Sequence, residues 1–174
     1  MINRSIFLVG PMGAGKSTIG KLLAAQLRLP FADTDKVLEE RTGADIPWIF
    51  DVEGEAGFRR RESDVLKELC HGDCQVIGTG GGIVLLAENR RMLKKCGHVA
   101  YLQAGVEQLL ERTSKNANRP LLYVPDPRKR IEEILQEREP LYREVADVIC
   151  TTDHLNPKQA SVLVAERLQD FLCQ

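Results

Sequence analysis

The chain has 174 residues, and its 24 Lys and Arg residues against 25 Asp and Glu residues give a formal net charge of -1. This length is typical of one domain that buries a sizeable core, so we expect residues 1–174 to form a single domain. The near-neutral charge and the aromatic content of only 5% are not typical of a nucleic-acid binder. We therefore expect no nucleic-acid partner.

The five cysteines are odd in number and scattered along the chain, which indicates reduced thiols in a cytosolic protein. Cys70, His71 and Cys74 lie close together, but no second Cys/His pair follows at the spacing of a zinc site, so we interpret them as a helix end and a loop. The sequence has no apolar run of membrane-spanning length and no signal-peptide pattern. We expect a cytoplasmic monomer without a membrane partner.

Short apolar segments alternate with longer amphipathic ones, which predicts parallel strands joined by crossover helices and hence an α/β fold. The predicted strands are 5–9, 29–32, 75–78, 98–102 and 147–150. The predicted helices are 16–27, 36–41, 55–69, 87–95, 106–112, 128–137 and 158–172. Between two of these helices, the polar and Pro-rich stretch 113–127 is too long for an ordinary connection, which indicates either a functional lid or a loose loop.

The segment from Gly10 to Ser17 fits the pattern G-x-x-x-x-G-K-S between a predicted strand and a predicted helix. Its glycines let backbone N–H groups approach phosphate oxygens, and the helix N-terminus adds partial positive charge. Lys16 can reach the β- and γ-phosphates, and the Ser17 hydroxyl can coordinate Mg²⁺. The motif predicts a nucleoside triphosphate site but leaves transferase, GTPase and ATPase functions open.

Two carboxylates follow the second predicted strand, at the sheet edge where ligands of open parallel sheets bind. One of them, Asp33 or Asp35, can serve the metal and the other an acceptor hydroxyl; alternatively, one simply caps the next helix. The sequence lacks the Asn-Lys-x-Asp and Asp-x-x-Gly motifs that a GTPase needs, and the chain is too short for a large ATPase machine. A transferase is therefore favoured.

Six motifs in order resemble the shikimate kinase family over essentially the whole chain. They are the loop Gly10–Thr18, Asp33-x-Asp35, Gly54-Glu-x-x-Phe58-Arg59-x-x-Glu62, Gly80-Gly-Gly82, Arg119-Pro-Leu-Leu122 and Arg138-x-Pro-Leu-Tyr142. The resemblance implies a three-layer α/β/α P-loop kinase fold with a five-stranded parallel sheet and a mobile lid at 113–127. It also implies transfer of the γ-phosphate of ATP to the 3-hydroxyl of shikimate, with Mg²⁺, in the route to chorismate and the aromatic amino acids.

The resemblance further implies a role for each matched residue. The ATP-binding residues would be Gly13, Ala14, Gly15, Lys16, Ser17, Thr18, Arg112 and Arg119. The catalytic residues would be Asp35, Lys16 and Arg119; the substrate-binding residues Asp35, Arg59, Gly81 and Arg138; and the metal-binding residues Ser17 and Asp33. Arg119 would act as a mobile cation over the γ-phosphate.

The chemistry of shikimate fits these roles, because it carries one carboxylate and three hydroxyls. Arg59 and Arg138 can bind the carboxylate through bidentate guanidinium forks, and Glu62, three residues after Arg59 on a predicted helix, can hold that side chain in place. Asp35 would orient or deprotonate the attacking hydroxyl. Phe50, Phe58 and Trp48 resemble an apolar pocket wall, with core packing as an equal explanation.

The adenine contacts are the least defined part of the site. The segment 152–156 lacks the Arg or Gln that some family members have there, so we expect backbone groups to contribute, with Arg112 able to stack on the ring.

Two other functions stay open: a kinase of gluconate or of a nucleoside monophosphate, and a nucleotide-binding regulator that has lost transfer activity.

Overall fold

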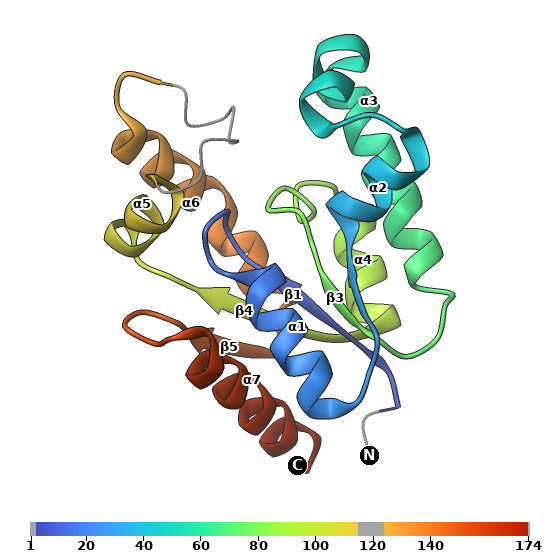
Figure 1. Cartoon of the computed structure of the whole chain (residues 1–174), viewed down its shortest axis with the longest axis vertical. Coiled ribbons are helices and arrows are strands. Elements are labelled where there is room, and N and C mark those ends of the chain that lie inside the picture. The colour runs from blue at the N-terminus through green and yellow to red at the C-terminus, as the bar shows by residue number, and fades with distance from the viewer. Residues whose placement is uncertain (1–2, 115–123, 174) are drawn as a thin grey trace.

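The computed structural model describes residues 3–114 and 124–173 and shows a five-stranded parallel sheet between two layers of helices (Figure 1). The strand order is β2-β3-β1-β4-β5. The strands are β1 Ser5–Val9, β2 Phe31–Asp33, β3 Val76–Gly78, β4 Gly97–Gln103 and β5 Val148–Thr151. The helices are α1 Lys16–Leu27, α2 Thr34–Thr42, α3 Ile46–Leu69, α4 Ala87–Cys96, α5 Val106–Ser114, α6 Pro127–Val145 and α7 Pro157–Leu172.

The central strand β1 is buried on both faces, which explains its continuous apolar sequence. Ile6 and Leu8 pack into the hydrophobic cluster that α1 and α7 cover. Phe7 and Val9 point to the other face and pack into the cluster built with α3, α4 and α6. The sheet is therefore the middle of three layers, and the predicted fold class is confirmed.

Most predicted elements differ from the structure at a boundary, and three of these differences affect the site. Strand β2 lies at Phe31–Asp33 rather than 29–32, so Asp33 is its last residue. Helix α3 spans Ile46–Leu69: the predicted segment 55–69 is helical, but a further segment capped by Asp45 precedes it, and non-helical backbone at Gly54, where φ is 69°, separates the two. Helix α6 runs past Pro140 to Val145 instead of ending at 137, since its last turns bury apolar side chains in the core.

The strand order brings the functional segments together. Since β3 lies between β2 and β1, the segments that follow these three strands meet at one edge of the sheet. They are the glycine-rich loop after β1, the Asp33–Asp35 segment after β2 and the turn at 79–82 after β3. Sequence segments far apart in the chain thus form one site.

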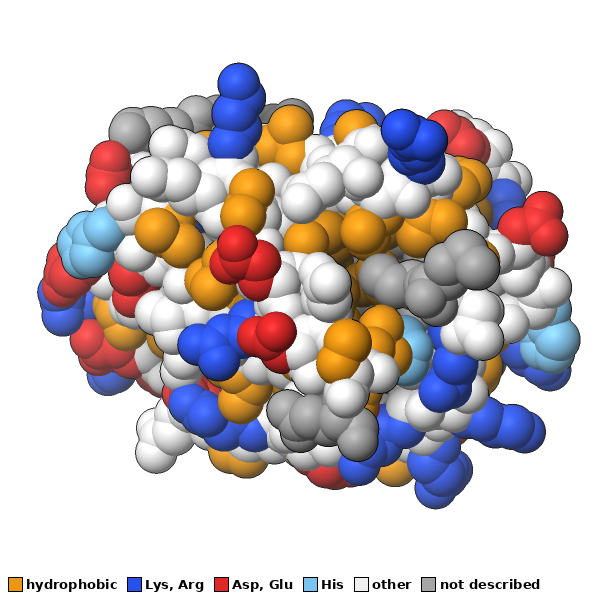
Figure 2. Space-filling model, turned by 90° about the horizontal axis from the view of Figure 1, so that it is seen from below, with side chains coloured by type: hydrophobic (Ala, Val, Ile, Leu, Met, Phe, Trp, Pro, Cys, Tyr) orange, Lys and Arg blue, Asp and Glu red, His pale blue; other side chains and the backbone are white. Residues whose placement is uncertain are grey.

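The outer surface agrees with the near-neutral charge of the chain. On the face seen in Figure 2, acidic and basic side chains are interspersed, with hydrophobic side chains between them. Among the described helices, none is long and apolar enough to cross a bilayer.

Candidate active site

The loop after β1 has the backbone shape of an anion cradle. Gly10, Gly13 and Gly15 have φ values of 145°, 82° and 92°, which side-chain-bearing residues rarely adopt. A Cβ atom on Gly10 would lie 2.6 Å from the Leu102 carbonyl oxygen, so this strand end needs glycine. Gly15 caps α1 with no side-chain hydrogen bond, which leaves the N–H groups of the first turn of the helix to bind an anion.

Lys16 folds back over this loop. Its Nζ donates to the carbonyl oxygens of Gly10 at 2.7 Å and Pro11 at 2.8 Å, and the residue is only 9% exposed. Next to it, Ala14 is buried, whereas Ser17 and Thr18 are exposed in the first turn of α1. The loop therefore holds one ammonium group and two hydroxyls at the place predicted for the phosphates.

Asp33 serves two neighbours with its two carboxylate oxygens. Oδ2 accepts a hydrogen bond of 2.5 Å from the Ser17 hydroxyl, and Oδ1 accepts from the backbone N–H groups of Asp35 and Lys36 at the start of α2. The two interpretations of Asp33, as a helix cap and as a residue beside the predicted metal site, are thus compatible. One hydroxyl and one carboxylate fit Mg²⁺, which prefers oxygen ligands and keeps several waters.

Asp35 and Glu62 both face Gly80. A Cβ atom on Gly80 would lie 2.9 Å from Oδ1 of Asp35 and 2.7 Å from Oε1 of Glu62. The Thr34 hydroxyl accepts a hydrogen bond of 3.0 Å from the Gly80 N–H and fixes the turn against α2. Burial, together with the negative charges of Asp33 and Glu62, raises the pKa of Asp35 to about 6, against the opposing effect of Lys16.

Glu62 holds Arg59, as the spacing predicts. Nη1 of Arg59 donates to Oε2 of Glu62 at 2.8 Å, and Nη2 donates to Glu55 at 3.2 Å. Burial raises the pKa of the Glu62 carboxyl, although Arg59 opposes this shift. Nε of Arg59 is buried without a hydrogen-bond partner among the described residues, and a Cβ atom on Gly82 would overlap Nη1. The guanidinium therefore lies directly against the glycine turn.

Arg138 reaches the same turn from α6. The residue is 7% exposed, and its buried Nε has no hydrogen-bond partner in the part of the chain that the structure describes. The Tyr142 hydroxyl donates to the Gly81 carbonyl oxygen at 2.5 Å. A Cβ atom on Gly81 would lie 3.4 Å from the Met12 nitrogen and 3.5 Å from the Gly10 oxygen, so the turn also touches the anion cradle.

Arg112 lies on the other side of the cradle. Its Nη2 donates to the Thr152 carbonyl oxygen at 3.0 Å, and its Nη1 donates to the Gly13 oxygen at 3.5 Å. The guanidinium thus connects the glycine-rich loop to the segment 152–156, where adenine contacts are expected. In that segment, the Asp153 carboxylate accepts from the Gly105 N–H.

The predicted Arg119 lies outside the described residues, so its role stays a prediction. The connection between the two helices is shorter than the predicted 113–127, because α5 extends to Ser114 and α6 begins at Pro127. Two of the three aromatic residues predicted for the pocket wall pack in the core instead. Phe50 stacks on buried Phe58 with ring centroids 4.4 Å apart, in agreement with the core-packing alternative.

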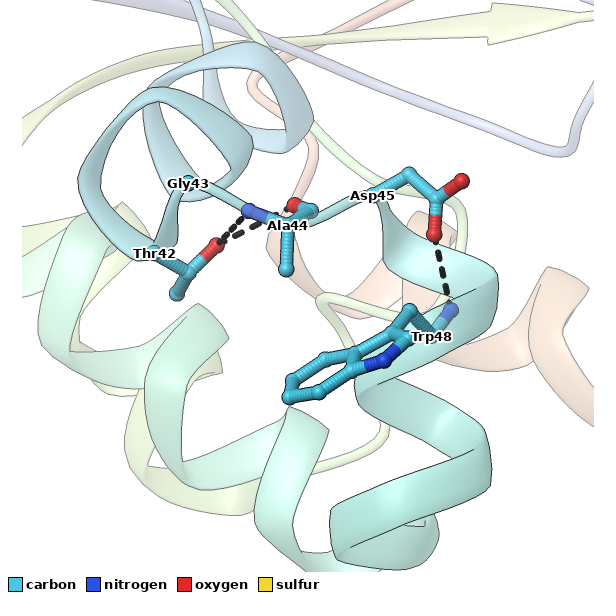
Figure 3. A pocket seen from close by; sticks show the side chains of 5 residues that line it. All are labelled: Thr42, Gly43, Ala44, Asp45 and Trp48. Atoms are coloured by element: carbon cyan, nitrogen blue, oxygen red, sulfur yellow. Dashed lines mark hydrogen bonds between the residues drawn. The ribbon is translucent and has the colours of Figure 1, made fainter.

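Trp48 belongs to another surface. It is 54% exposed and lines a hollow of about 400 Å³ with the α2–α3 connection, shown in Figure 3. The hollow is lined by Thr42, Gly43, Ala44, Asp45 and Trp48, and apart from Trp48 none of these is a predicted site residue.

Sequence reasoning assigns no role to Thr34 or Tyr142, although both lie within the predicted motifs. In the structure, Thr34 accepts from the glycine turn and Tyr142 donates to it. A signal is present for Tyr142, which lies four residues after Arg138 and therefore on the same face of a helix. No spacing rule points from Thr34 to Gly80.

Comparison with known proteins gives concordant matches. The family model described as shikimate kinase matches residues 12–169. A shikimate kinase from Pseudomonas savastanoi pv. phaseolicola is 54% identical over 168 residues, covering 97% of this chain and 98% of the relative. The structure of "Shikimate kinase from Acinetobacter baumannii in complex with shikimate" superposes with a TM-score of 0.93 at 45% identity, covering 97% of this chain and 94% of that one.

A more distant likeness concerns the fold alone. A gluconokinase from Sinorhizobium meliloti superposes with a TM-score of 0.57 at 15% identity, covering 99% of this chain and 98% of that one.

Proposed function

Because the chain belongs to the shikimate kinase family, and so is an ATP-dependent kinase that phosphorylates shikimate, we propose that the segments around the glycine turn form its active site. In this proposal the single domain 1–174 holds both substrates. ATP lies along the loop after β1, and shikimate lies between α2, α3, α6 and the turn at 80–82. The 3-hydroxyl of shikimate then faces the γ-phosphate across the Gly10–Gly81 contact.

The nucleotide side uses residues that donate to phosphate oxygens. Backbone N–H groups of Gly13, Ala14 and Gly15 and the first turn of α1 bind the phosphates, with Ser17 and Thr18 beside them. On ATP binding, Lys16 exchanges the carbonyl oxygens of its own loop for phosphate oxygens, and its charge stabilises the developing transition state. Arg112 covers the nucleotide next to Thr152.

An ATP-dependent kinase is expected to use a divalent metal, and we propose Mg²⁺ here. The Ser17 hydroxyl and the Asp33 carboxylate, in contact with each other, would hold it, with Asp33 acting directly or through water. When bound, Mg²⁺ supplies positive charge that neutralises the β- and γ-phosphate oxygens.

The acceptor side is built for a carboxylate. Arg59 and Arg138 each keep a buried Nε without a hydrogen-bond partner among the described residues. Both guanidinium groups have carboxylate neighbours, Glu55 and Glu62 for Arg59 and Glu137 at 3.6 Å for Arg138. A buried N–H donor without a hydrogen bond is nevertheless costly, so a further acceptor is expected on binding. These two guanidinium groups, one of them against Gly82, are the observation that carries the proposal, because the shikimate carboxylate can accept from both.

Asp35 accepts the hydroxyl proton in this mechanism. The hydroxyl oxygen attacks the γ-phosphorus, the bond to the β–γ bridging oxygen breaks to give ADP, and the hydroxyl proton passes to the Asp35 carboxylate. A pKa near 6 leaves the carboxylate ionised at neutral pH yet basic enough to take part. Burial against Gly80 and the nearby charges of Asp33 and Glu62 explain why this carboxylate is more basic than an ordinary Asp.

The role of Arg119 rests on the resemblance alone, since it lies outside the described residues. We propose that it neutralises charge on the transferred phosphoryl group, within a lid over the nucleotide. We further propose a cytoplasmic monomer that acts in the route to chorismate, without a nucleic-acid or membrane partner.

An ADP-release assay with and without shikimate tests the function. We expect strong stimulation by shikimate, and little by gluconate or nucleoside monophosphates, in a parallel panel of acceptors. ADP release that millimolar shikimate leaves unchanged would overturn the proposal. Stimulation by gluconate instead would establish the second candidate kinase, and ATP binding without transfer to any acceptor would establish a regulator.

A further inference from the structure

The Gly80 N–H is a buried backbone donor in the proposed acceptor site, and its partner is a side chain of another element. Gly80 is buried, and its N–H donates to the Thr34 hydroxyl at 3.0 Å. Thr34 is 1% exposed and is the first residue of α2, between Asp33 and Asp35 in the sequence. The hydrogen bond therefore joins the turn after β3 to the helix that carries Asp35.

Two carboxylates lie around the same glycine. A Cβ atom on Gly80 would lie 2.9 Å from Oδ1 of Asp35 and 2.7 Å from Oε1 of Glu62. Oε1 of Glu62 is buried and accepts no hydrogen bond within residues 3–114 and 124–173. A hydrogen bond to a carboxylate is about twice as strong as one between neutral groups. The Gly80 N–H thus has charged acceptors beside it, yet it donates to a neutral hydroxyl.

This choice of acceptor matters for Asp35. In the proposed mechanism its carboxylate accepts from the hydroxyl of shikimate, so an oxygen lone pair occupied by the backbone is lost to the substrate. A buried N–H without an acceptor is costly. If the Thr34 hydroxyl were absent, the Gly80 N–H would therefore be drawn to the carboxylates of Asp35 and Glu62.

The turn itself has a second anchor, which does not depend on Thr34. The N–H and the hydroxyl of Thr79 both donate to the Leu8 carbonyl oxygen, at 3.2 Å and 2.9 Å, and hold the start of the turn against β1. Loss of the Thr34 hydroxyl should therefore redirect one N–H without releasing the turn from the sheet.

We propose that Thr34 is a positioning residue that occupies the Gly80 N–H and thereby keeps the Asp35 carboxylate free for the acceptor hydroxyl. The inference rests on the proposed function, in which Asp35 accepts the proton of that hydroxyl. Thr34 takes no proton itself and acts through Gly80 on Asp35.

The test compares Thr34→Val with the matched control Ser5→Ala. Thr34→Val keeps the branched shape of the side chain and removes the hydroxyl. The Ser5 hydroxyl is also buried and accepts from the N–H of Gln75 at 3.2 Å, just before β3. Both variants thus leave one backbone N–H beside β3 without its hydroxyl acceptor, but only Thr34→Val does so next to Asp35.

The readout is the set of steady-state constants for shikimate and ATP. We expect kcat/KM for shikimate to fall about tenfold in Thr34→Val, the order of effect of one hydrogen bond to a charged group, with KM for ATP within about twofold of wild type. Ser5→Ala should keep the wild-type constants. Thr34→Ser keeps the hydroxyl and should restore most of kcat/KM.

A double-mutant cycle with Asp35→Asn separates an effect through Asp35 from a general loss of structure. If Thr34 acts through Asp35, Thr34→Val should lower kcat/KM by less than about twofold in the Asp35→Asn background, where no general base is left to impair. Rates are divided by the concentration of sites that bind an ATP analogue, so the unfolded fraction cancels. Thr34→Ala also lacks the hydroxyl and gives the same comparison if Thr34→Val does not fold.

Three outcomes would overturn the positioning role while wild-type turnover of shikimate upholds the proposed function. They are wild-type kcat/KM in Thr34→Val, an equal fall in Thr34→Ser or Ser5→Ala, and an undiminished effect of Thr34→Val in the Asp35→Asn background. A wild-type protein that does not phosphorylate shikimate would instead overturn the proposed function, and this inference with it.

Discussion

The Ser17 hydroxyl and the Asp33 carboxylate lie 2.5 Å apart and join the start of α1 to the end of β2. Since the second oxygen of Asp33 caps α2, one side chain supports both a helix and the proposed metal site. The two roles have different chemical requirements. A cap needs only an acceptor oxygen, whereas a metal ligand benefits from negative charge.

Replacing Asp33 by Asn should separate these roles. Asn caps helices about as well as Asp, so the free energy of unfolding should change by less than about 0.5 kcal/mol, whereas Asp33→Ala should cost about 1 kcal/mol. Both variants should need a higher Mg²⁺ concentration for half-maximal turnover. Urea unfolding and a Mg²⁺ titration of ADP release provide the measurements. Equal instability of the two variants, with wild-type Mg²⁺ dependence, would contradict the assignment.

Asp35→Asn should abolish most of the turnover while preserving ATP binding. The amide cannot accept the hydroxyl proton, so kcat should fall by about 10²–10⁴-fold, the usual contribution of a positioned general base. In the wild type, kcat/KM for shikimate should fall as the pH drops below about 6, where Asp35 becomes protonated. Steady-state kinetics from pH 5 to 8 and calorimetric titration with an ATP analogue test both points. Near-normal turnover of Asp35→Asn would rule out the role.

The same substitution should stabilise the fold at neutral pH. The pKa of Asp35 is raised in the folded state from 3.8 to about 6, so the folded protein binds the proton more tightly than the unfolded chain. This contribution to stability is present below about pH 4 and is lost as the pH rises through about 6. Asp35→Asn, which is neutral throughout, should therefore gain about 1–3 kcal/mol over wild type at about pH 7.5 and little at about pH 4. Urea unfolding at the two pH values gives the comparison.

Gly82→Ala should weaken shikimate binding and also lower stability. The added Cβ would overlap Nη1 of Arg59, which donates to buried Glu62, so displacing the guanidinium leaves that carboxylate without its partner. The displaced guanidinium then leaves the site, and KM for shikimate should rise about tenfold or more, as expected for loss of a charge-assisted hydrogen bond. Gly72→Ala, where the nearest atom would be 3.5 Å away, is the control for added bulk.

The measurement for Gly82→Ala is the pair of KM values for shikimate and ATP, together with the thermal midpoint. A change in the ATP value alone, or a similar change in Gly72→Ala, would show that Arg59 does not bind shikimate in this position.

Arg112→Ala should affect the nucleotide and not the acceptor. Loss of the guanidinium that connects Gly13 to Thr152 should raise KM for ATP about tenfold, the effect expected for one charged hydrogen-bonding group. Arg130→Ala is a suitable control, because Arg130 pairs on the exposed face of α6, with Glu133 at 3.3 Å. Initial-rate kinetics with each substrate varied in turn distinguishes the two. If Arg112→Ala raised KM for shikimate and not KM for ATP, Arg112 would not belong to the nucleotide side of the site.

The layers of the fold could be predicted because buried parallel strands are continuous apolar runs between amphipathic helices. The errors have local causes. Gly54 and Pro140 both interrupt a helical pattern, and sequence rules end a helix at such residues. At Gly54 the rule holds, because the backbone leaves the helical conformation (φ 69°, ψ 178°) and a second helical segment follows. At Pro140 tertiary packing overrides the rule, and the helix continues to Val145 because Tyr142 and Val145 are buried in the core.

Within the site, contacts inside one helix were predictable and contacts between distant segments were not. The pair Arg59–Glu62 follows from a spacing of three residues. The hydrogen bonds of Gly80 with Thr34 and of Gly81 with Tyr142 span 46 and 61 residues, and depend on a strand order that periodicity cannot supply. The motif at Asp33–Asp35 predicted two roles, but only the structure shows Asp33 serving both cap and Ser17.

The place of β1 in the sheet has a consequence for biosynthesis. This strand precedes both of its neighbours, β3 and β4, in the chain, and Gly10 packs against the carbonyl of Leu102. The apolar β1 segment thus leaves the ribosome long before either partner strand exists, and pairing at such sequence distance is slow. A nascent chain that stops before β4 exposes this segment and is prone to aggregate. Nucleotide binding is therefore acquired only after β3 and β4 are made, although its main motif precedes both strands.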